Sequence, residues 1–174
     1  MDLRTKKKIF LIGMPGSGKS TVGKMLAKEL KFRFIDTDIV IQDIFHLSIN
    51  EIFNRYGEGA FREKELQVMN ELIYESDLVV STGGGLVVHK ELIEKLNKNG
   101  ITIYLKVTPK ILYNRLIDDD TRPLLDKNQY DKGKFDKINA LYQQRKREYE
   151  KASFTVNANK SEDTVLKSIL TKLK

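Results

Sequence analysis

Apolar residues along this chain fall into two alternating patterns. Short runs rich in apolar and β-branched residues have the length and composition of buried strands. Between these runs, apolar residues recur every three or four positions, as they do on one face of a helix. Strands that alternate with helices predict a parallel sheet covered on both faces, whose ligands bind beyond the carboxyl ends of the strands. The predicted strands are residues 8–12, 33–36, 78–82, 101–106 and 153–157.

Local signals set several helix boundaries. Ser48 and Glu51 form a capping box that begins one helix, and the glycines at 57 and 59 separate it from a second. Pro109 occupies the first position of the helix that follows the fourth strand. The remaining intervals carry helical patterns. The predicted helices cover residues 21–30, a segment that starts near 39, 49–56, 60–75, 134–151 and 161–173, the last capped by Ser161.

The stretch between residues 116 and 134 follows neither pattern. It is polar and contains three consecutive aspartates at 118–120. A long irregular segment inside a compact domain commonly serves as a lid. We therefore expect a lid over about 115–131, within one domain spanning 1–174.

Composition narrows the class of protein. A chain of 174 residues with 40% hydrophobic and 32% charged residues is expected to fold as one globular domain. It has no cysteine, which fits a reducing cytoplasm, and no apolar run near the ~18 residues that span a bilayer. The net charge is +7, but the basic residues are spread along the chain without interleaved aromatics. We interpret them as solvated helix faces, and expect neither a nucleic-acid nor a membrane partner.

Residues 13–20 match the phosphate-loop pattern G-x-x-x-x-G-K-[ST]. In this pattern backbone N–H groups surround phosphate oxygens, Lys19 reaches the outer phosphates and the Ser20 hydroxyl can bind magnesium. A chance glycine-rich turn is the alternative. The predicted strand before the loop and the predicted helix after it favour a nucleotide site, because a helix N-terminus attracts anions.

Two carboxylates follow the second predicted strand. Asp36 and Asp38 could divide the work of phosphoryl transfer to an alcohol, one helping to hold magnesium and the other orienting the attacking hydroxyl. They could instead cap the helix that follows. Their place one unit after the phosphate loop favours the catalytic interpretation.

An arginine on the predicted helix 60–75, Arg62, is a candidate for binding an acid. Arg62 and Glu65 are three residues apart, so Glu65 can hold the Arg62 fork that would receive a carboxylate. An ordinary surface ion pair is the alternative. Arg145 and Tyr149 lie one turn apart on a later helix, where the basic neighbours of Arg145 are typical of an ordinary basic helix face.

Glycines 83–85 follow the third predicted strand, where a ligand could approach the backbone closely; a flexible connection is the alternative. This strand lacks the aspartate of a standard Walker B segment, so Asp36 or water must supply that contact to magnesium. In the expected lid, Arg122 could stabilise charge on a transferred phosphoryl group.

Taken together, these motifs resemble the shikimate kinase family. The elements G-x-x-G-x-G-K-S, D-T-D, F-R-x-x-E, T-G-G-G, R-P-L-L and R-x-x-x-Y occur in the family's order over about residues 8–173. The resemblance implies a three-layer α/β P-loop NTPase fold whose five-stranded parallel sheet, flanked by helices, has the strand order 2-3-1-4-5. It also implies ATP-dependent phosphorylation of the shikimate 3-hydroxyl with Mg²⁺, by a cytoplasmic enzyme that we expect to be a monomer.

The resemblance also implies substrate-binding helices over about 37–75, and it assigns roles to individual residues. On the nucleotide side, Arg122 resembles the lid arginine and Arg115 an arginine that packs on adenine. On the shikimate side, Asp38 resembles the general base, and the Gly84 backbone resembles a donor to a substrate hydroxyl. The carboxylate clamp corresponds to Arg62 and Arg145, the magnesium site to Ser20 and Asp36, and the phosphate cradle to Gly16, Ser17, Gly18, Lys19, Ser20 and Thr21.

Two departures and two alternatives remain. The loop at 157–160 lacks the arginine or proline that the family often has there, and the acidic lid differs from more basic ones. A kinase for another polyhydroxy acid such as gluconate would keep the phosphate loop without needing both arginines. A nucleotide-binding regulatory module would need no acceptor base, so Asp38 argues against it.

Overall fold

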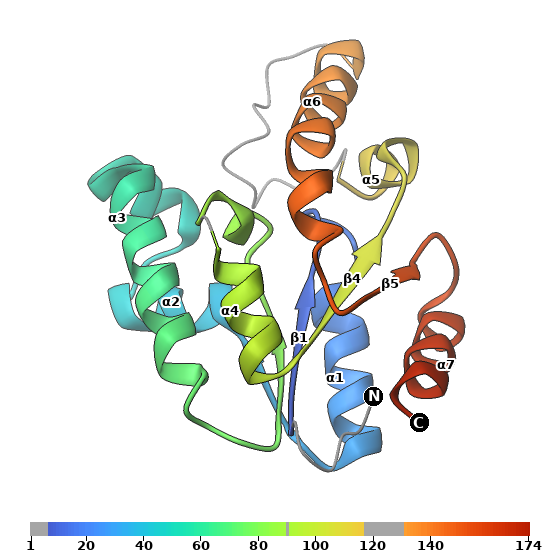
Figure 1. The fold of residues 1–174 in the computed structure, drawn as a ribbon. Coiled ribbons are helices and arrows are strands. Elements are labelled where there is room, and N and C mark those ends of the chain that lie inside the picture. Colours follow the sequence, from blue (N-terminus) through green and yellow to red (C-terminus); the bar gives the residue numbers. More distant parts are fainter. Residues whose placement is uncertain (1–6, 90, 117–130) are drawn as a thin grey trace.

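A computed structural model of the chain describes residues 7–89, 91–116 and 131–174. The layers appear in Figure 1, where a central sheet separates two groups of helices. The strands are β1 (Lys8–Ile12), β2 (Arg33–Asp36), β3 (Leu78–Ser81), β4 (Ile101–Lys106) and β5 (Phe154–Asn157). The helices are α1 (Lys19–Leu30), α2 (Thr37–Phe45), α3 (Ile49–Leu72), the 3-10 helix η1 (Leu86–Val88), α4 (Leu92–Asn99), α5 (Pro109–Leu116), α6 (Asp131–Tyr149) and α7 (Glu162–Leu173).

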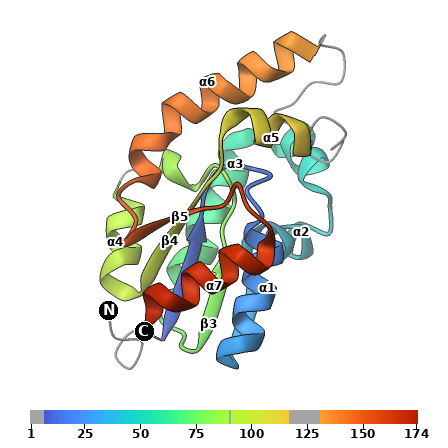
Figure 2. The ribbon, with the colours of Figure 1, turned by 90° about the vertical axis from the view of Figure 1, so that its right-hand side faces the viewer.

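All five strands run parallel, as the alternation of strands and helices predicted, and their order β2-β3-β1-β4-β5 is the one that the resemblance implied. The side chains of Ile9 to Ile12 in β1 are fully buried because helices cover both faces of the sheet. Helices α1 and α7 pack together on one face, and α3 and α4 lie on the other, as the two views show (Figures 1 and 2). Helices α5 and α6 stand beyond the carboxyl ends of the strands, where a ligand site is expected.

The predicted interruption of the helical stretch 49–75 is present at Gly57. Within α3 this residue has a φ of 80° and a ψ of 166°, which are not helical, so two helical segments meet there at a kink. The predicted capping box is present at its start: the Glu51 N–H donates to the Ser48 hydroxyl, and the Ser48 N–H donates to the Glu51 carboxylate. No loop is present at Gly59, so the second segment of α3 continues as a helix to Leu72.

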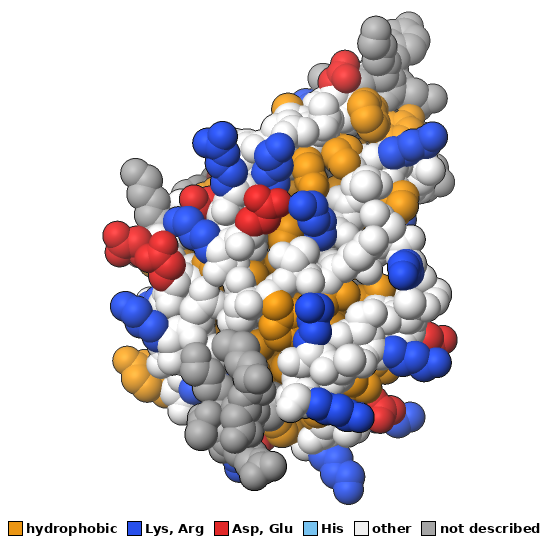
Figure 3. Space-filling model, turned by 45° about the vertical axis from the view of Figure 1, so that its right-hand side comes forward, with side chains coloured by type: hydrophobic (Ala, Val, Ile, Leu, Met, Phe, Trp, Pro, Cys, Tyr) orange, Lys and Arg blue, Asp and Glu red, His pale blue; other side chains and the backbone are white. Residues whose placement is uncertain are grey.

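Other boundaries differ by a few residues at most. Each predicted strand agrees within one residue, and Pro109 begins α5 as expected. Helix α6 starts at 131 rather than 134 and ends at 149 rather than 151. Among the described helices, none combines the length and apolar character needed to cross a membrane. On the face shown in Figure 3, Lys and Arg side chains are scattered and form no continuous stripe.

Candidate active site

The phosphate loop, Gly13–Ser20, connects β1 to α1 at the carboxyl edge of the sheet. Lys19 is buried, and its Nζ donates to the carbonyls of Gly13 and Met14, each at 3.0 Å. Ser17 is also buried, whereas Ser20 and Thr21 are exposed in the first turn of α1. The loop thus presents a lysine and a helix N-terminus toward one place, which is the arrangement that binds a polyphosphate.

Arg115 connects the phosphate loop to the loop after β5. Its Nη1 donates to the Gly16 carbonyl at 3.1 Å, and its Nη2 donates to the Ala158 carbonyl at 3.3 Å. That second loop is also tied to the start of α5, because the Asn159 side chain accepts from the Thr108 N–H at 2.9 Å. Arg115 therefore lies between two segments that could surround a nucleotide.

Three side-chain oxygens meet beside the phosphate loop. The Ser20 hydroxyl donates to Asp36 Oδ2 at 2.5 Å and lies 3.3 Å from the Ser81 hydroxyl. The other Asp36 oxygen accepts from the Asp38 N–H at 3.1 Å and caps α2. Asp36 therefore both caps a helix and faces the phosphate loop, so the two interpretations of this residue are compatible.

This oxygen cluster fits a hard cation. Hydroxyl and carboxylate oxygens suit Mg²⁺, which commonly takes one or two protein carboxylates and completes its shell with phosphate and water. Within the described ranges, no three acidic, histidine or cysteine side chains gather into a metal site of their own. Ser81, which sequence reasoning missed, ends β3 where a Walker B aspartate would stand, and its register opposite Asp36 brings the two together.

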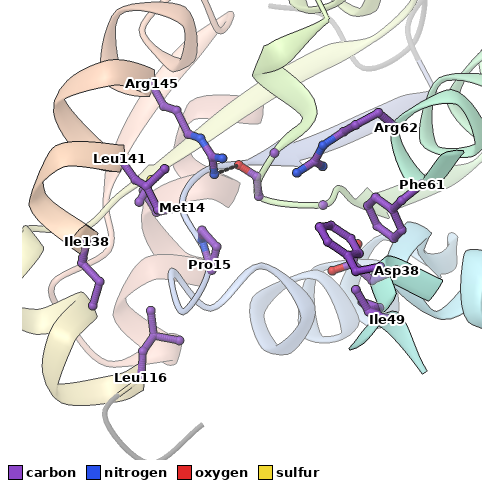
Figure 4. A pocket seen from close by; sticks show the side chains of 14 residues that line it. Met14, Pro15, Asp38, Ile49, Phe61, Arg62, Leu116, Ile138, Leu141 and Arg145 are labelled. Atoms are coloured by element: carbon purple, nitrogen blue, oxygen red, sulfur yellow. Dashed lines mark hydrogen bonds between the residues drawn. The ribbon is translucent and has the colours of Figure 1, made fainter. Parts of the chain in front are cut away.

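A pocket opens next to the phosphate loop (Figure 4). Four residues that the sequence singled out line it together: Asp38, Arg62, Gly84 and Arg145. Arg62 and Arg145 enter from opposite sides (Figure 4). The Gly83–Gly85 segment, here called the glycine turn, contacts both, because Arg145 donates to the Gly84 carbonyl and a Cβ at Gly85 would meet the Arg62 guanidinium. The remaining lining residues are mostly apolar: Met14, Pro15, Ile49, Phe53, Phe61, Gly83, Gly85, Leu116, Ile138 and Leu141.

Arg62 is held by two carboxylates of its own helix. Its Nη1 donates to Glu65 at 2.9 Å, and its Nη2 donates to Glu58 at 2.9 Å. Glu65 is fully buried and also lies 3.6 Å from His89 Nε2. Burial lowers the pKa of Arg62, but the two carboxylates outweigh it and leave the pKa above its usual value, so Arg62 stays charged. The Arg62–Glu65 pair was predicted, whereas Glu58 was missed.

Arg145 is positioned differently. It is buried on α6, and its Nη1 donates to the Gly84 carbonyl at 3.0 Å. The interpretation of Arg145 as part of a merely basic surface is wrong, because its side chain is only 6% exposed. Its helical neighbour Tyr149, noted in the sequence only as part of a motif, donates to the same carbonyl.

The glycine turn is in close contact with the rest of the site. A Cβ at Gly84 would lie 2.5 Å from Pro15 of the phosphate loop, and one at Gly85 would lie 2.2 Å from the Arg62 guanidinium. Only glycine allows the backbone to approach both neighbours this closely. Arg122 and nearly all of the expected lid lie outside the described residues.

A phosphate loop after the central strand of a parallel sheet, joined to a pocket with two arginines and a carboxylate, defines a small-molecule kinase of the P-loop class. The family model for shikimate kinase matches residues 15–174. A shikimate kinase of Clostridium botulinum (strain Loch Maree / Type A3) is 48% identical over 160 residues, 90% of this chain and 91% of that protein. The chain belongs to the shikimate kinase family.

Solved structures agree with this assignment. Shikimate kinase from Acinetobacter baumannii in complex with shikimate has a TM-score of 0.85 at 33% identity, covering 98% of this chain and 96% of that one. A gluconokinase from Sinorhizobium meliloti, at 16% identity and a TM-score of 0.60 over 95% of this chain and 90% of that one, shares only the fold. The predicted α/β P-loop fold and the predicted kinase of the shikimate kinase family are confirmed.

Proposed function

We propose that this protein transfers the γ-phosphoryl group of ATP to the 3-hydroxyl of shikimate, releasing shikimate 3-phosphate and ADP. One observation carries the proposal: Asp38, Arg62, Gly84 and Arg145 line a single pocket that touches the phosphate loop through Met14 and Pro15. A phosphoryl donor and a hydroxylated acid bound in these adjoining sites would meet at their shared wall.

Arg62 and Arg145 bind and orient the carboxylate of shikimate. A guanidinium matches a carboxylate in two parallel hydrogen bonds, and each such charge-assisted contact is stronger than a neutral one. The apolar side chains around them leave few competing polar contacts for the acid. Two arginines from different helices, α3 and α6, therefore define both the charge and the direction of the substrate.

Asp38 orients the attacking hydroxyl and accepts its proton. Its Oδ1 would lie 2.9 Å from a Cβ built on Gly83, so the carboxylate faces the glycine turn. Phosphoryl transfer passes through a loose transition state, in which positioning and electrostatic stabilisation supply most of the rate enhancement. Asp38 contributes to positioning, and the phosphate loop contributes to electrostatic stabilisation.

On the nucleotide side, Lys19 neutralises the outer phosphates, and the backbone of residues 16–21 receives their oxygens. Ser20 and Asp36 would hold Mg²⁺, which when bound supplies positive charge to the β- and γ-phosphates. Arg115 contacts the nucleotide from between its two loops, and Arg122, in a lid over about 115–131, remains a predicted donor to the transferred group. The helices over about 37–75 form the shikimate half of a single domain.

A coupled assay of ADP release, run with shikimate, with gluconate and without an acceptor, tests this function. We expect release only with shikimate. Release without an acceptor, or only with gluconate, would contradict the proposal. Asp38→Asn is expected to lower kcat by about 100-fold or more, the usual contribution of a positioned base, while ATP binding measured by titration calorimetry stays close to wild type. Full turnover in Asp38→Asn would contradict the role of the base.

We also propose that the enzyme acts as a monomer in the cytoplasm on small molecules, without nucleic-acid or membrane partners. One copy of the chain carries the residues assigned to both half-sites, and the sequence has no cysteine, which fits a reducing compartment. Size-exclusion chromatography with light scattering tests the monomer: a mass of twice 20.1 kDa would contradict it.

A further inference from the structure

Two side chains of α6 hold one backbone carbonyl. Arg145 and Tyr149, one helical turn apart, both donate to the oxygen of Gly84, at 3.0 and 2.5 Å. The Arg145 bond can be seen in Figure 4. Arg145 also lines the pocket, so its position serves the substrate directly, whereas Tyr149 is not among the lining residues. Tyr149 therefore contacts the glycine turn on the side that faces away from the pocket.

The Tyr149 hydroxyl is fixed by the packing of its ring. Tyr149 is fully buried and stacks on Tyr104 of β4, with ring centroids 5.1 Å apart and planes 22° apart. Its hydroxyl also lies 3.9 Å from the Met14 sulfur in the phosphate loop. Burial raises the pKa of Tyr149 well above its usual value, so the phenol keeps its proton and remains a donor. One hydroxyl thus contacts both loops of the site.

The held carbonyl determines how the glycine turn faces the pocket. In a trans peptide the C=O and the next N–H point in opposite directions, so a Gly84 carbonyl directed at α6 turns the Gly85 N–H away from α6. Arg62 lies against the turn on that other side, since a Cβ at Gly85 would approach its guanidinium to 2.2 Å. Three successive glycines have little intrinsic preference for one conformation, so an external contact must select it.

We propose that Tyr149 is a positioning residue that selects the binding conformation of the glycine turn by holding the Gly84 carbonyl. This inference rests on the proposed function for its kinetic consequence, but not for its structural one. Without the hydroxyl, Arg145 alone must satisfy the Gly84 carbonyl, and the same guanidinium must also bind the substrate carboxylate. Loss of the hydroxyl therefore disturbs the shikimate half of the site more than the ATP half.

Tyr149→Phe tests the kinetic consequence, with Tyr104→Phe as the matched control. Each change removes one oxygen from a buried ring of the same stack, but the Tyr104 hydroxyl lies beside Tyr142, whereas the Tyr149 hydroxyl donates to the Gly84 carbonyl. We expect Tyr149→Phe to raise the KM for shikimate about 5- to 30-fold, as for loss of one buried hydrogen bond, with the KM for ATP within about twofold. Tyr104→Phe should leave both constants within about twofold.

Amide hydrogen exchange in the substrate-free protein tests the structural consequence. Peptides that contain residues 83–85 should exchange about tenfold faster in Tyr149→Phe than in wild type or Tyr104→Phe. If wild type shows no shikimate-dependent turnover, the proposed function fails, and the exchange result still decides the role of Tyr149. An unchanged exchange rate, or equal increases in both KM values, would overturn the inference.

Discussion

The two arginines that face each other across the pocket are held in opposite ways. Arg62 lies between two carboxylates of its own helix, Glu58 and Glu65, whereas Arg145 donates to a backbone carbonyl and has no ion pair within the described part of the chain. The charge of Arg62 is thus already compensated, whereas the buried Arg145 forms no ion pair with the residues that the structure describes. A buried charge without a partner is unfavourable, so an arriving anion gains most at Arg145. Residues that look equivalent in the sequence therefore differ in what they offer a substrate.

Replacing each arginine by alanine gives the largest expected effect. Arg145→Ala should raise the KM for shikimate about 100-fold or more, because a bidentate ionic contact contributes roughly 3 kcal/mol. Arg62→Ala should raise it less, about 10- to 50-fold, since Glu58 and Glu65 already share its donors. Steady-state kinetics with each substrate varied in turn measure both. Equal increases in the KM for ATP would contradict a carboxylate clamp.

The same two variants should differ in stability in the reverse order. Arg62→Ala leaves the fully buried Glu65 without its main partner and should lower the free energy of unfolding by about 3 kcal/mol. Arg145→Ala removes an uncompensated charge while Tyr149 still satisfies the Gly84 carbonyl, so the loss should stay below about 1 kcal/mol. Urea unfolding measures both values. A larger loss for Arg145→Ala would show that its charge is compensated in solution.

Removing the charge of Glu65 should weaken the positioning of Arg62. Glu65→Gln keeps the shape of the side chain but replaces a charge-assisted hydrogen bond by a neutral one. We expect the KM for shikimate to rise about 3- to 10-fold with the KM for ATP unchanged. Kinetics of the matched Glu63→Gln variant, a nearby glutamate that does not line the pocket, provide the control. A similar change in both variants would contradict the specific role of Glu65.

Glu58 gives the smallest effect, with the opposite sign. Its carboxylate is half exposed and occupies the Arg62 donors that a substrate carboxylate would use. Glu58→Gln should therefore lower the KM for shikimate by about two- to threefold, since an exposed ion pair is weak. Steady-state kinetics with the concentration of shikimate varied measure this change in KM. An increase in KM would instead mean that Glu58 helps to position Arg62.

Most of the fold could be predicted because its signals are local. Apolar runs located every strand, and the Ser48–Glu51 capping box marked the start of α3. The interruption at Gly57 was predicted from its glycine. That Gly59 stays helical was not predicted, because whether a glycine breaks a helix depends on what the flanking turns pack against. The strand order came from the resemblance, since periodicity does not determine which strands become neighbours.

The site was predictable only where a motif named the residue. Ser81 was missed because its place depends on the register of β3 against β2, a contact between distant parts of the chain. Glu58 precedes Arg62 by four residues and could have been found from helical spacing, but the predicted break at Gly57 and Gly59 placed it outside the helix. The role of Tyr149 depends on where α6 crosses the glycine turn, which no local pattern contains.

The contact between Gly84 and Pro15 has one more consequence. Because a Cβ at Gly84 would nearly coincide with the proline ring, the two loops are separated only by van der Waals contact. The two half-sites are thus separated only by the backbones of the glycine turn and the phosphate loop, which both follow strands of the sheet. The distance between the two half-sites is therefore set by packing within the protein, before either substrate binds.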